Sequence, residues 1–221
     1  FGGLTWDDVI KVEVSGYGAS ANAVINGQAD ASMGSSVSSI FNKTNASPRG
    51  LFFPPMPHND EAGWKRAIGV APHFAKAVVT NFIGSSDSNK SFEGMNYPYP
   101  IFVTMEKTSE DLSYHLTEAV MENYDQFKDS GPGMDGYQLS NQNFSWIFPY
   151  HPGAVKYYKK KGVWTSKHDK HNANLIKRQD VLAKAWQKTL KANLSGDSFK
   201  KRWLENRASA LKVAGMPNAY N

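Results

Sequence analysis

Cysteine is absent from the 221 residues, and this excludes disulfide bonds, thiolate metal sites and cysteine nucleophiles. The absence leaves the compartment open, because periplasmic proteins often manage without disulfides and cytosolic proteins usually do. No run approaches about 18 consecutive apolar residues, so no segment is predicted to span a bilayer. With 40% hydrophobic residues, the chain can still bury a substantial core.

The motifs that carry common enzyme chemistry are also missing, among them Gly-x-Ser-x-Gly, the Gly-x-x-x-x-Gly-Lys phosphate loop and His-Glu-x-x-His. The carboxylate pairs Asp7–Asp8 and Glu110–Asp111 stand at predicted helix starts, where the helix dipole accounts for them. His168 and His171 lack a carboxylate partner at metal-binding spacing, so we expect them on a solvated surface. These observations predict a protein that is not an enzyme and holds no cofactor or metal.

The start of the chain has no basic segment followed by an apolar one, so we expect any secretory signal to have been removed. The first residues instead have the pattern of a segment inside a domain, with two glycines before a helix start at Thr5–Asp8. We therefore expect that part of the protein preceding Phe1 is absent.

Charge is distributed unevenly along the chain. Residues 165–221 carry twelve Lys and Arg against four Asp and Glu, a local net charge of +8, whereas residues 1–164 carry about −3. A basic tail of this kind can bind nucleic acid or an acidic surface. Its apolar stripe (Leu175, Val181, Leu182, Trp186) indicates packed helices with the lysines as a solvated face, which a transporter or a second copy can contact.

The first hundred residues have α/β character. Alternation over Val9–Val14 predicts a strand, Ala19–Asn26 a helix with Gly27 as its C-cap, and Ala29–Met33 a second strand. This order favours a βαβ step and a parallel sheet. Leu51–Pro54 predicts another short strand, and residues 55–98 form the least regular part.

The second half is mainly helical. Ile101–Met105 is the clearest predicted strand. A helix should begin at Thr108 or Ser109 and run to Phe127, with Leu112 and Leu116 on its buried face. Further helices are predicted over 155–159, 172–193 and 199–213.

One segment resembles a family signature. Phe148–Tyr158 reads FPYHPGAVKYY and is followed by GVWT at Gly162–Thr165. This segment is similar to the TAXI group of TRAP-transporter solute-binding proteins. Three further segments are similar to the same family and follow one another in the family's order: Leu4–Val9, Tyr17–Ala31 and Ser109–Tyr114. The resemblance implies a two-lobed α/β periplasmic-binding-protein fold of type II, lacking here its N-terminal part.

The resemblance also implies an organisation of the chain. Residues 1–100 would form the remainder of the second α/β lobe, 101–164 the hinge return and part of the first lobe, and 165–221 basic helices packed on the lobes. The implied protein is bacterial and periplasmic. Its partners would be a small organic acid and the membrane subunits of a TRAP transporter, with no nucleic acid.

Ligand-binding residues are expected at two turns and one strand entrance. Tyr17 and Gly18 lie where a predicted strand leads into a helix, and helix N-termini supply free N–H groups to a carboxylate. Gly34, Ser35 and Ser36 follow a predicted strand, and the family has a Gly-rich ligand loop there. The resemblance makes Tyr97 a cleft or hinge residue, although packing against the neighbouring prolines accounts for it equally well.

These observations favour a receptor that captures an amino acid or a dicarboxylate by closure of two lobes. Two alternatives stay open, an enzyme on a related two-lobed scaffold and a basic nucleic-acid-binding protein that uses the C-terminal helices.

Overall fold

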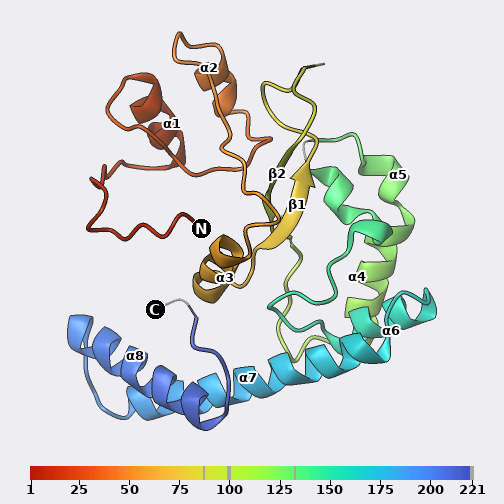
Figure 1. Cartoon of the computed structure of the whole chain (residues 1–221). Helices are drawn as coiled ribbons and strands as arrows, with labels where there is room; N and C mark the ends of the chain where they lie inside the picture. The colour runs from red at the N-terminus through yellow and green to blue at the C-terminus, as the bar shows by residue number, and fades with distance from the viewer. Residues whose placement is uncertain (87, 99–100, 132, 220–221) are drawn as a thin grey trace. The chain divides into compact units, whose positions relative to one another are not determined.

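The computed structural model describes residues 1–86, 88–98, 101–131 and 133–219 (Figure 1). The chain divides into two compact units. Unit 1 comprises Phe1–Gly69, Phe74–Tyr97 and Ser130–Gly133, and unit 2 comprises Val70–His73, Pro98–Asp129 and Met134–Asn221. The described part is mixed α/β, as predicted, and most of its regular structure is helical. None of the described helices is both long and apolar enough to cross a membrane.

Unit 1 contains three helices, α1 (Tyr17–Ile25), α2 (Phe41–Asn45) and α3 (Glu61–Val70, whose last residue belongs to unit 2). Helix α1 confirms the predicted helix, and it ends because Gly27 adopts φ +72°, a left-handed conformation that favours glycine. Helix α3 is held by Trp64, which is buried and donates its indole N–H to the carbonyl oxygen of Pro57 at 3.0 Å.

A two-stranded antiparallel hairpin is the only sheet among the residues that the structure describes. Strand β1 (Ala75–Val79) pairs with β2 (Phe92–Asn96), so that Ala75 faces Asn96 and Val79 faces Phe92. Met56 lies alongside β2, because its N–H donates to the carbonyl oxygen of Glu93 at 2.7 Å. The exposed loop predicted at residues 84–90 connects the two strands, although residue 87 lies outside the described part.

The predicted strands are wrong, and so is the parallel sheet. Four segments expected to be strands have no ladder partner in the described chain: Val9–Val14, Ala29–Met33, Leu51–Pro54 and Ile101–Met105. Ile10 in the first of them is 94% exposed. Alternating apolar residues give β propensity, but a strand forms only where another strand accepts its hydrogen bonds. The hairpin instead lies within residues 55–98, which we predicted to be the least regular part.

Unit 2 is built from α4 (Glu110–Glu122), α5 (Tyr124–Phe127), α6 (Pro152–Lys160), α7 (Ser166–Leu190) and α8 (Gly196–Val213). Two short 3-10 turns, Met134–Tyr137 and Leu139–Asn141, lie between α5 and α6. The predicted helices of this region are confirmed, although α6, α7 and α8 begin three to six residues earlier than expected. Ser109 caps α4 as predicted, by accepting a hydrogen bond from the N–H of Leu112 at 3.1 Å.

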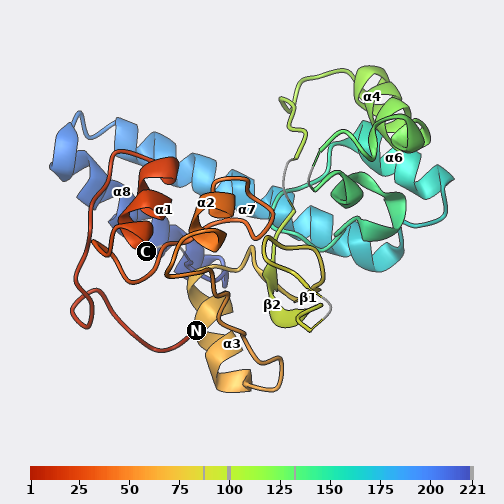
Figure 2. The same ribbon diagram turned by 90° about the horizontal axis from the view of Figure 1, so that it is seen from above.

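The core of unit 2 is aromatic and lies between α4 and α6, which run side by side in Figures 1 and 2. Tyr157 is 1% exposed, and Tyr158 and Trp164 are buried beside it. Phe144 and Tyr150 pack on these rings with centroid separations of 4.8–5.8 Å. Burial raises the pKa of Tyr150 to about 12, and it raises the pKa values of Tyr157 and Tyr158 as well.

Gly153 allows α4 and α6 to approach closely. A Cβ atom at this position would overlap the backbone carbonyl oxygen of Glu110, and it would lie 2.7 Å from the backbone nitrogen of Tyr114. The predicted core face of α4 is therefore wrong. Ser113 is buried at the contact with α6, whereas Leu112, which we predicted to be buried, is 60% exposed. His151 precedes α6 and caps it, because its Nδ1 accepts a hydrogen bond from the N–H of Gly153 at 3.2 Å.

Helices α7 and α8 form an antiparallel hairpin (Figure 1). Trp186 of α7 packs edge-on against Phe199 and Trp203 of α8, at centroid distances of 5.2 and 5.0 Å. Thr189 is fully buried and accepts a hydrogen bond from the amide of Asn206 at 3.0 Å. Leu190, the last residue of α7, is exposed.

The two histidines at the start of α7 are half-buried rather than solvated. His168 Nδ1 accepts from the N–H of Thr165 at 3.1 Å, and His171 Nε2 donates to the carbonyl oxygen of Trp146 at 2.6 Å. Within the described residues, no group of three or more His, Asp or Glu is arranged to hold a metal ion.

Two carboxylates of α4 join it to α6. Glu122 accepts hydrogen bonds from the Tyr157 hydroxyl at 2.8 Å and from Lys161 Nζ at 3.0 Å. Glu118 accepts from Lys160 Nζ at 3.1 Å and from Tyr114 at 3.0 Å. The hydrogen bonds from the lysines are the main cause that lowers the pKa of each carboxylate.

We therefore predict that Glu122→Gln destabilises the protein at neutral pH and has little effect in acid. A carboxylate whose folded pKa lies below the ordinary 4.5 stabilises the fold above that value, and this stabilisation is lost as pH falls through the folded pKa. Urea denaturation at neutral pH and well below pH 4.5 measures the difference. Glu61→Gln, a change at the exposed start of α3, is the control. An equal loss from Glu122→Gln at both pH values would contradict the prediction.

Candidate functional site

The turn after Met33 is packed against the first residue of α1. The backbone N–H of Ser35 donates to the Tyr17 hydroxyl oxygen at 3.0 Å, across 18 positions of sequence. A Cβ atom on Gly34 would overlap both the Tyr17 hydroxyl and the edge of the Phe41 ring. A side chain at position 34 would therefore force the Tyr17 and Phe41 side chains to move, because the turn lies directly on both rings.

Ser36 connects the same turn to the loop end of the hairpin. Its carbonyl oxygen accepts a hydrogen bond from the N–H of Ile83 at 2.9 Å, and its hydroxyl lies 3.5 Å from the carbonyl oxygen of Asn81. The turn is thus fixed on one side by α1 and α2 and on the other by the segment that follows β1.

Aromatic rings continue from Tyr17 into the hairpin. Tyr17 packs edge-on against Phe41, and Phe41 packs edge-on against Phe53. Phe53 in turn stacks in parallel on Phe92, with a centroid distance of 5.6 Å and an interplanar angle of 6°. Phe82 closes the cluster against both of these rings and is buried.

A cavity of about 230 Å³ lies beside this aromatic cluster, on the side of the hairpin loop. Its lining consists of Leu51, Phe52, Phe53, Pro55, Phe82, Ile83, Gly84, Asn89 and Phe92. Ile83 is shared with the turn, because it donates the hydrogen bond to Ser36. We call the turn and this cavity together the turn–pocket site.

The cavity suits the apolar part of a small molecule. No Asp, Glu, His, Lys or Arg is among the described residues that line it, so its walls bring apolar side chains and one amide but no acid or base. Phe52 contributes a largely free wall, since its side chain is 79% exposed. Cavities lined mainly by aromatic side chains with a few polar groups are typical of small-molecule sites.

The structure brings together four of the six predicted ligand-binding residues. Tyr17, Gly34 and Ser35 are in direct contact, and Ser36 continues the turn toward the cavity. Gly18 follows Tyr17 in the first turn of α1, and a Cβ atom there would have no neighbour within 4 Å. That Tyr17, Gly18 and the three residues of the turn bind a ligand stays a prediction.

Tyr97 lies elsewhere. It follows β2 and packs edge-on against Phe74, the residue that precedes β1, at a centroid distance of 5.5 Å. Ser36 contacts the opposite end of the hairpin. A strand of five residues spans about 17 Å, so the length of the hairpin separates Tyr97 from the residues that Ser36 contacts. Its neighbours Tyr99 and Pro100 lie outside the described residues.

Sequence reasoning missed the aromatic cluster beside the cavity. Phe41, Phe53, Phe82 and Phe92 are distributed over about fifty positions with no helical or strand period, so no pattern joins them. The one local signal was Phe52–Phe53 before two prolines, which we assigned to a strand.

The described fold and the turn–pocket site together define a mixed α/β protein with a small cavity that has no charged side chain among its described lining residues. A sequence model of the NMT1-like family matches residues 1–162 of the 221, and the chain belongs to this family. The family is of the periplasmic solute-binding type: its members take small-molecule ligands, are generally not enzymes and are typically extracytoplasmic. No curated protein and no solved structure matches the chain.

We predict opposite effects from alanine at two glycines of the site. Gly34→Ala should lower the free energy of unfolding by about 1–3 kcal/mol, because the added methyl group overpacks the contact with Tyr17 and Phe41. Gly18→Ala has open space in the first turn of α1, and it should stabilise by about 0.5–1 kcal/mol. Urea denaturation measures both. A neutral Gly34→Ala would show that the turn does not pack as described.

Proposed function

We propose that the chain is the solute-binding receptor of a TRAP-type transporter of the TAXI group, and that it carries a small organic anion to membrane subunits. The observation that supports this most directly is the cavity that shares Ile83 with the turn, in a chain that belongs to a solute-binding family. The ligand would be an amino acid or a dicarboxylate, released unchanged. The site residues would be Tyr17, Gly18, Gly34, Ser35 and Ser36, with Tyr97 as a hinge residue of a two-lobed type II fold.

The start of α1 supplies the feature that an anion needs. The first N–H groups of a helix have no partner within the helix, and the helix dipole places partial positive charge there. In α1 the cap residue is Gly16, and no side chain accepts a hydrogen bond from the helix start. The carboxylate of a ligand would bind at this end, close to the turn, while its carbon skeleton occupied the aromatic cavity.

Capture would then follow the mechanism of lobe closure. A ligand shifts the equilibrium toward the closed form only by the difference between its affinities for the closed and open forms. Contacts with the turn are suited to this role, since the turn is already fixed by α1, α2 and the hairpin loop and loses little freedom on binding.

A thermal-shift screen of the full-length protein against small carboxylates tests the proposal. A ligand present at a hundred times its dissociation constant should stabilise the protein by about 2.7 kcal/mol. Phe52→Ala should weaken binding of such a ligand about tenfold, because it removes an exposed cavity wall without disturbing the fold.

The matched control is Phe102→Ala, which truncates another exposed phenylalanine, in unit 2, and should leave the affinity unchanged. Stabilisation by no carboxylate in the screen would contradict the receptor proposal. If a carboxylate binds and Phe52→Ala leaves its affinity unchanged, the ligand does not use this cavity.

A further inference from the structure

Five lysines form a continuous row along one flank of α7. They are Lys170, Lys177, Lys184, Lys188 and Lys191, the last at the C-cap, spaced seven, seven, four and three residues apart. At 3.6 residues per turn these positions fall within about 60° of each other around the helix axis, and they extend over about 30 Å. We call these residues the lysine row.

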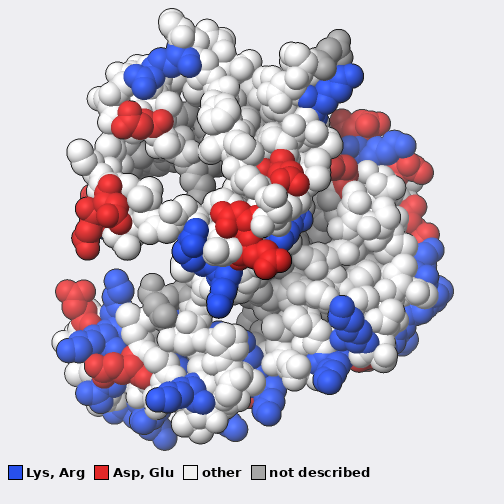
Figure 3. Space-filling view, in the orientation of Figure 1, with Lys and Arg blue, Asp and Glu red and all other residues white. Residues whose placement is uncertain are grey.

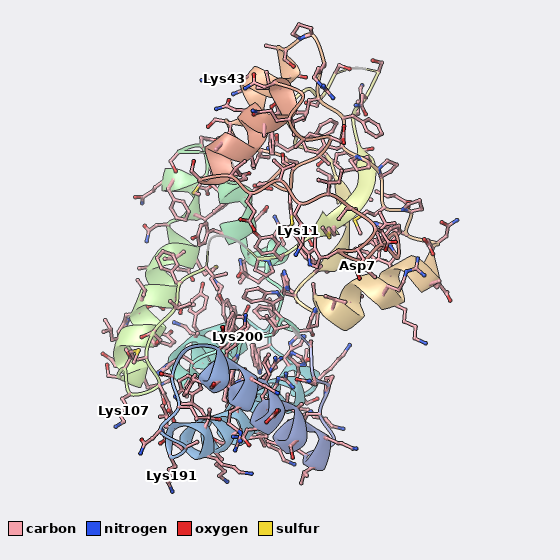
Figure 4. All side chains as sticks on the ribbon, turned by 90° about the vertical axis from the view of Figure 1, so that its left-hand side faces the viewer. Asp7, Lys11, Lys43, Lys107, Lys191 and Lys200 are labelled. Carbon is pink, nitrogen blue, oxygen red and sulfur yellow. The ribbon has the colours of Figure 1, made fainter. Side chains whose placement is uncertain are left out.

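The row faces away from the contact with α8, since the residues that pack there, Ala185 and Thr189, lie on a different side of α7. All five lysines are exposed, and none of them forms an ion pair within the described part of the chain. Figure 3 shows the predominance of Lys and Arg over the two helices, and in Figure 4 Lys191 projects from the end of the hairpin.

Few acidic residues of α7 lie near the lysine row. Helix α7 contains only Asp169 and Asp180. Asp169 is engaged by Lys159 at 2.9 Å and by the Trp164 indole at 2.9 Å. Asp180 lies at the edge of the row, between Lys177 and Lys184. The fold accounts for the row only in part: Asp180 lies three and four residues from Lys177 and Lys184, and the helix dipole favours Lys188 and Lys191 at the C-terminal end of α7. Lys184, Lys188 and Lys191 still repel one another at spacings of four and three residues.

The row also lies outside the part of the chain that the family defines. The family match ends at residue 162, and the turn–pocket site lies in unit 1, whereas every residue of the row belongs to unit 2 after that point. Binding of the solute therefore does not explain the row.

We infer that the lysine row is a docking surface for an anionic phospholipid bilayer. A long straight row of exposed cations fits an extended sheet of negative headgroups, and each Lys near such a surface adds about fivefold to the partition coefficient. Lysine acts as a flexible point charge, which suits headgroups that move laterally, whereas fixed bidentate phosphate recognition favours Arg. A nucleic acid is less well matched, because no aromatic side chain of α7 lies within the row to stack on bases.

Sedimentation with lipid vesicles tests this inference on the full chain. Wild-type protein should bind vesicles of phosphatidylcholine with about one-third phosphatidylglycerol, should not bind phosphatidylcholine alone, and should dissociate as salt is added. The triple variant Lys184→Gln, Lys188→Gln, Lys191→Gln should bind the anionic vesicles about a hundredfold more weakly. Arginine at the same three positions keeps the charge and should retain binding.

The matched control changes three exposed lysines elsewhere, Lys43→Gln, Lys65→Gln and Lys107→Gln, and lowers the net charge equally. It should bind nearly as well as wild type. Equal losses from both triple variants, or failure of wild type to prefer anionic vesicles, would overturn the inference. So would tighter binding to duplex DNA than to vesicles, or a dimer that only the row variant dissociates. Because none of these measurements involves the solute, they succeed or fail independently of the proposed receptor function.

Discussion

The turn–pocket site depends on the close packing of Gly34 against Tyr17 and Phe41. With no side chain at position 34, the backbone lies directly on the two rings, and the Ser35 N–H reaches the Tyr17 hydroxyl. The next residue then meets the hairpin loop through Ile83. One glycine thereby joins α1, α2 and the β1–β2 connection, and the aromatic cluster that these elements share with Phe53 lies beside the cavity.

Unit 2 is organised by a second close approach, between the backbones of α4 and α6 at Gly153. This contact explains why the Phe148–Tyr158 segment, which resembles a family signature, has a structural role. His151 caps α6, Gly153 admits the backbone of α4, and Tyr157 and Tyr158 form the core. The signature segment thus holds two helices together, whereas the candidate ligand contacts lie in a turn of ordinary composition. The family signature and the candidate ligand contacts thus lie in different parts of the molecule.

Different surfaces serve different interactions in the functions we propose. The turn–pocket site is small and partly open, with no charged side chain among its described lining residues, which suits a metabolite. The lysine row is long, exposed and of one sign. The two surfaces are also separate in the sequence, since one lies in the family-matched segment and the other in the helices that follow it.

The sequence by itself determined the helices, because caps, turn glycines and helical spacing act within a few residues: Ser109, Gly27 and His151 all do what their local pattern indicates. The sequence also indicated that Gly34, Ser35 and Ser36 form a turn of small residues. Only the tertiary structure decided the strands and the cavity. Val9–Val14 and Ile101–Met105 have the composition of strands, yet pairing depends on a partner distant in sequence. In the same way, the aromatic wall consists of four phenylalanines that no local period connects, and contacts made across tens of residues leave no signal in a single sequence.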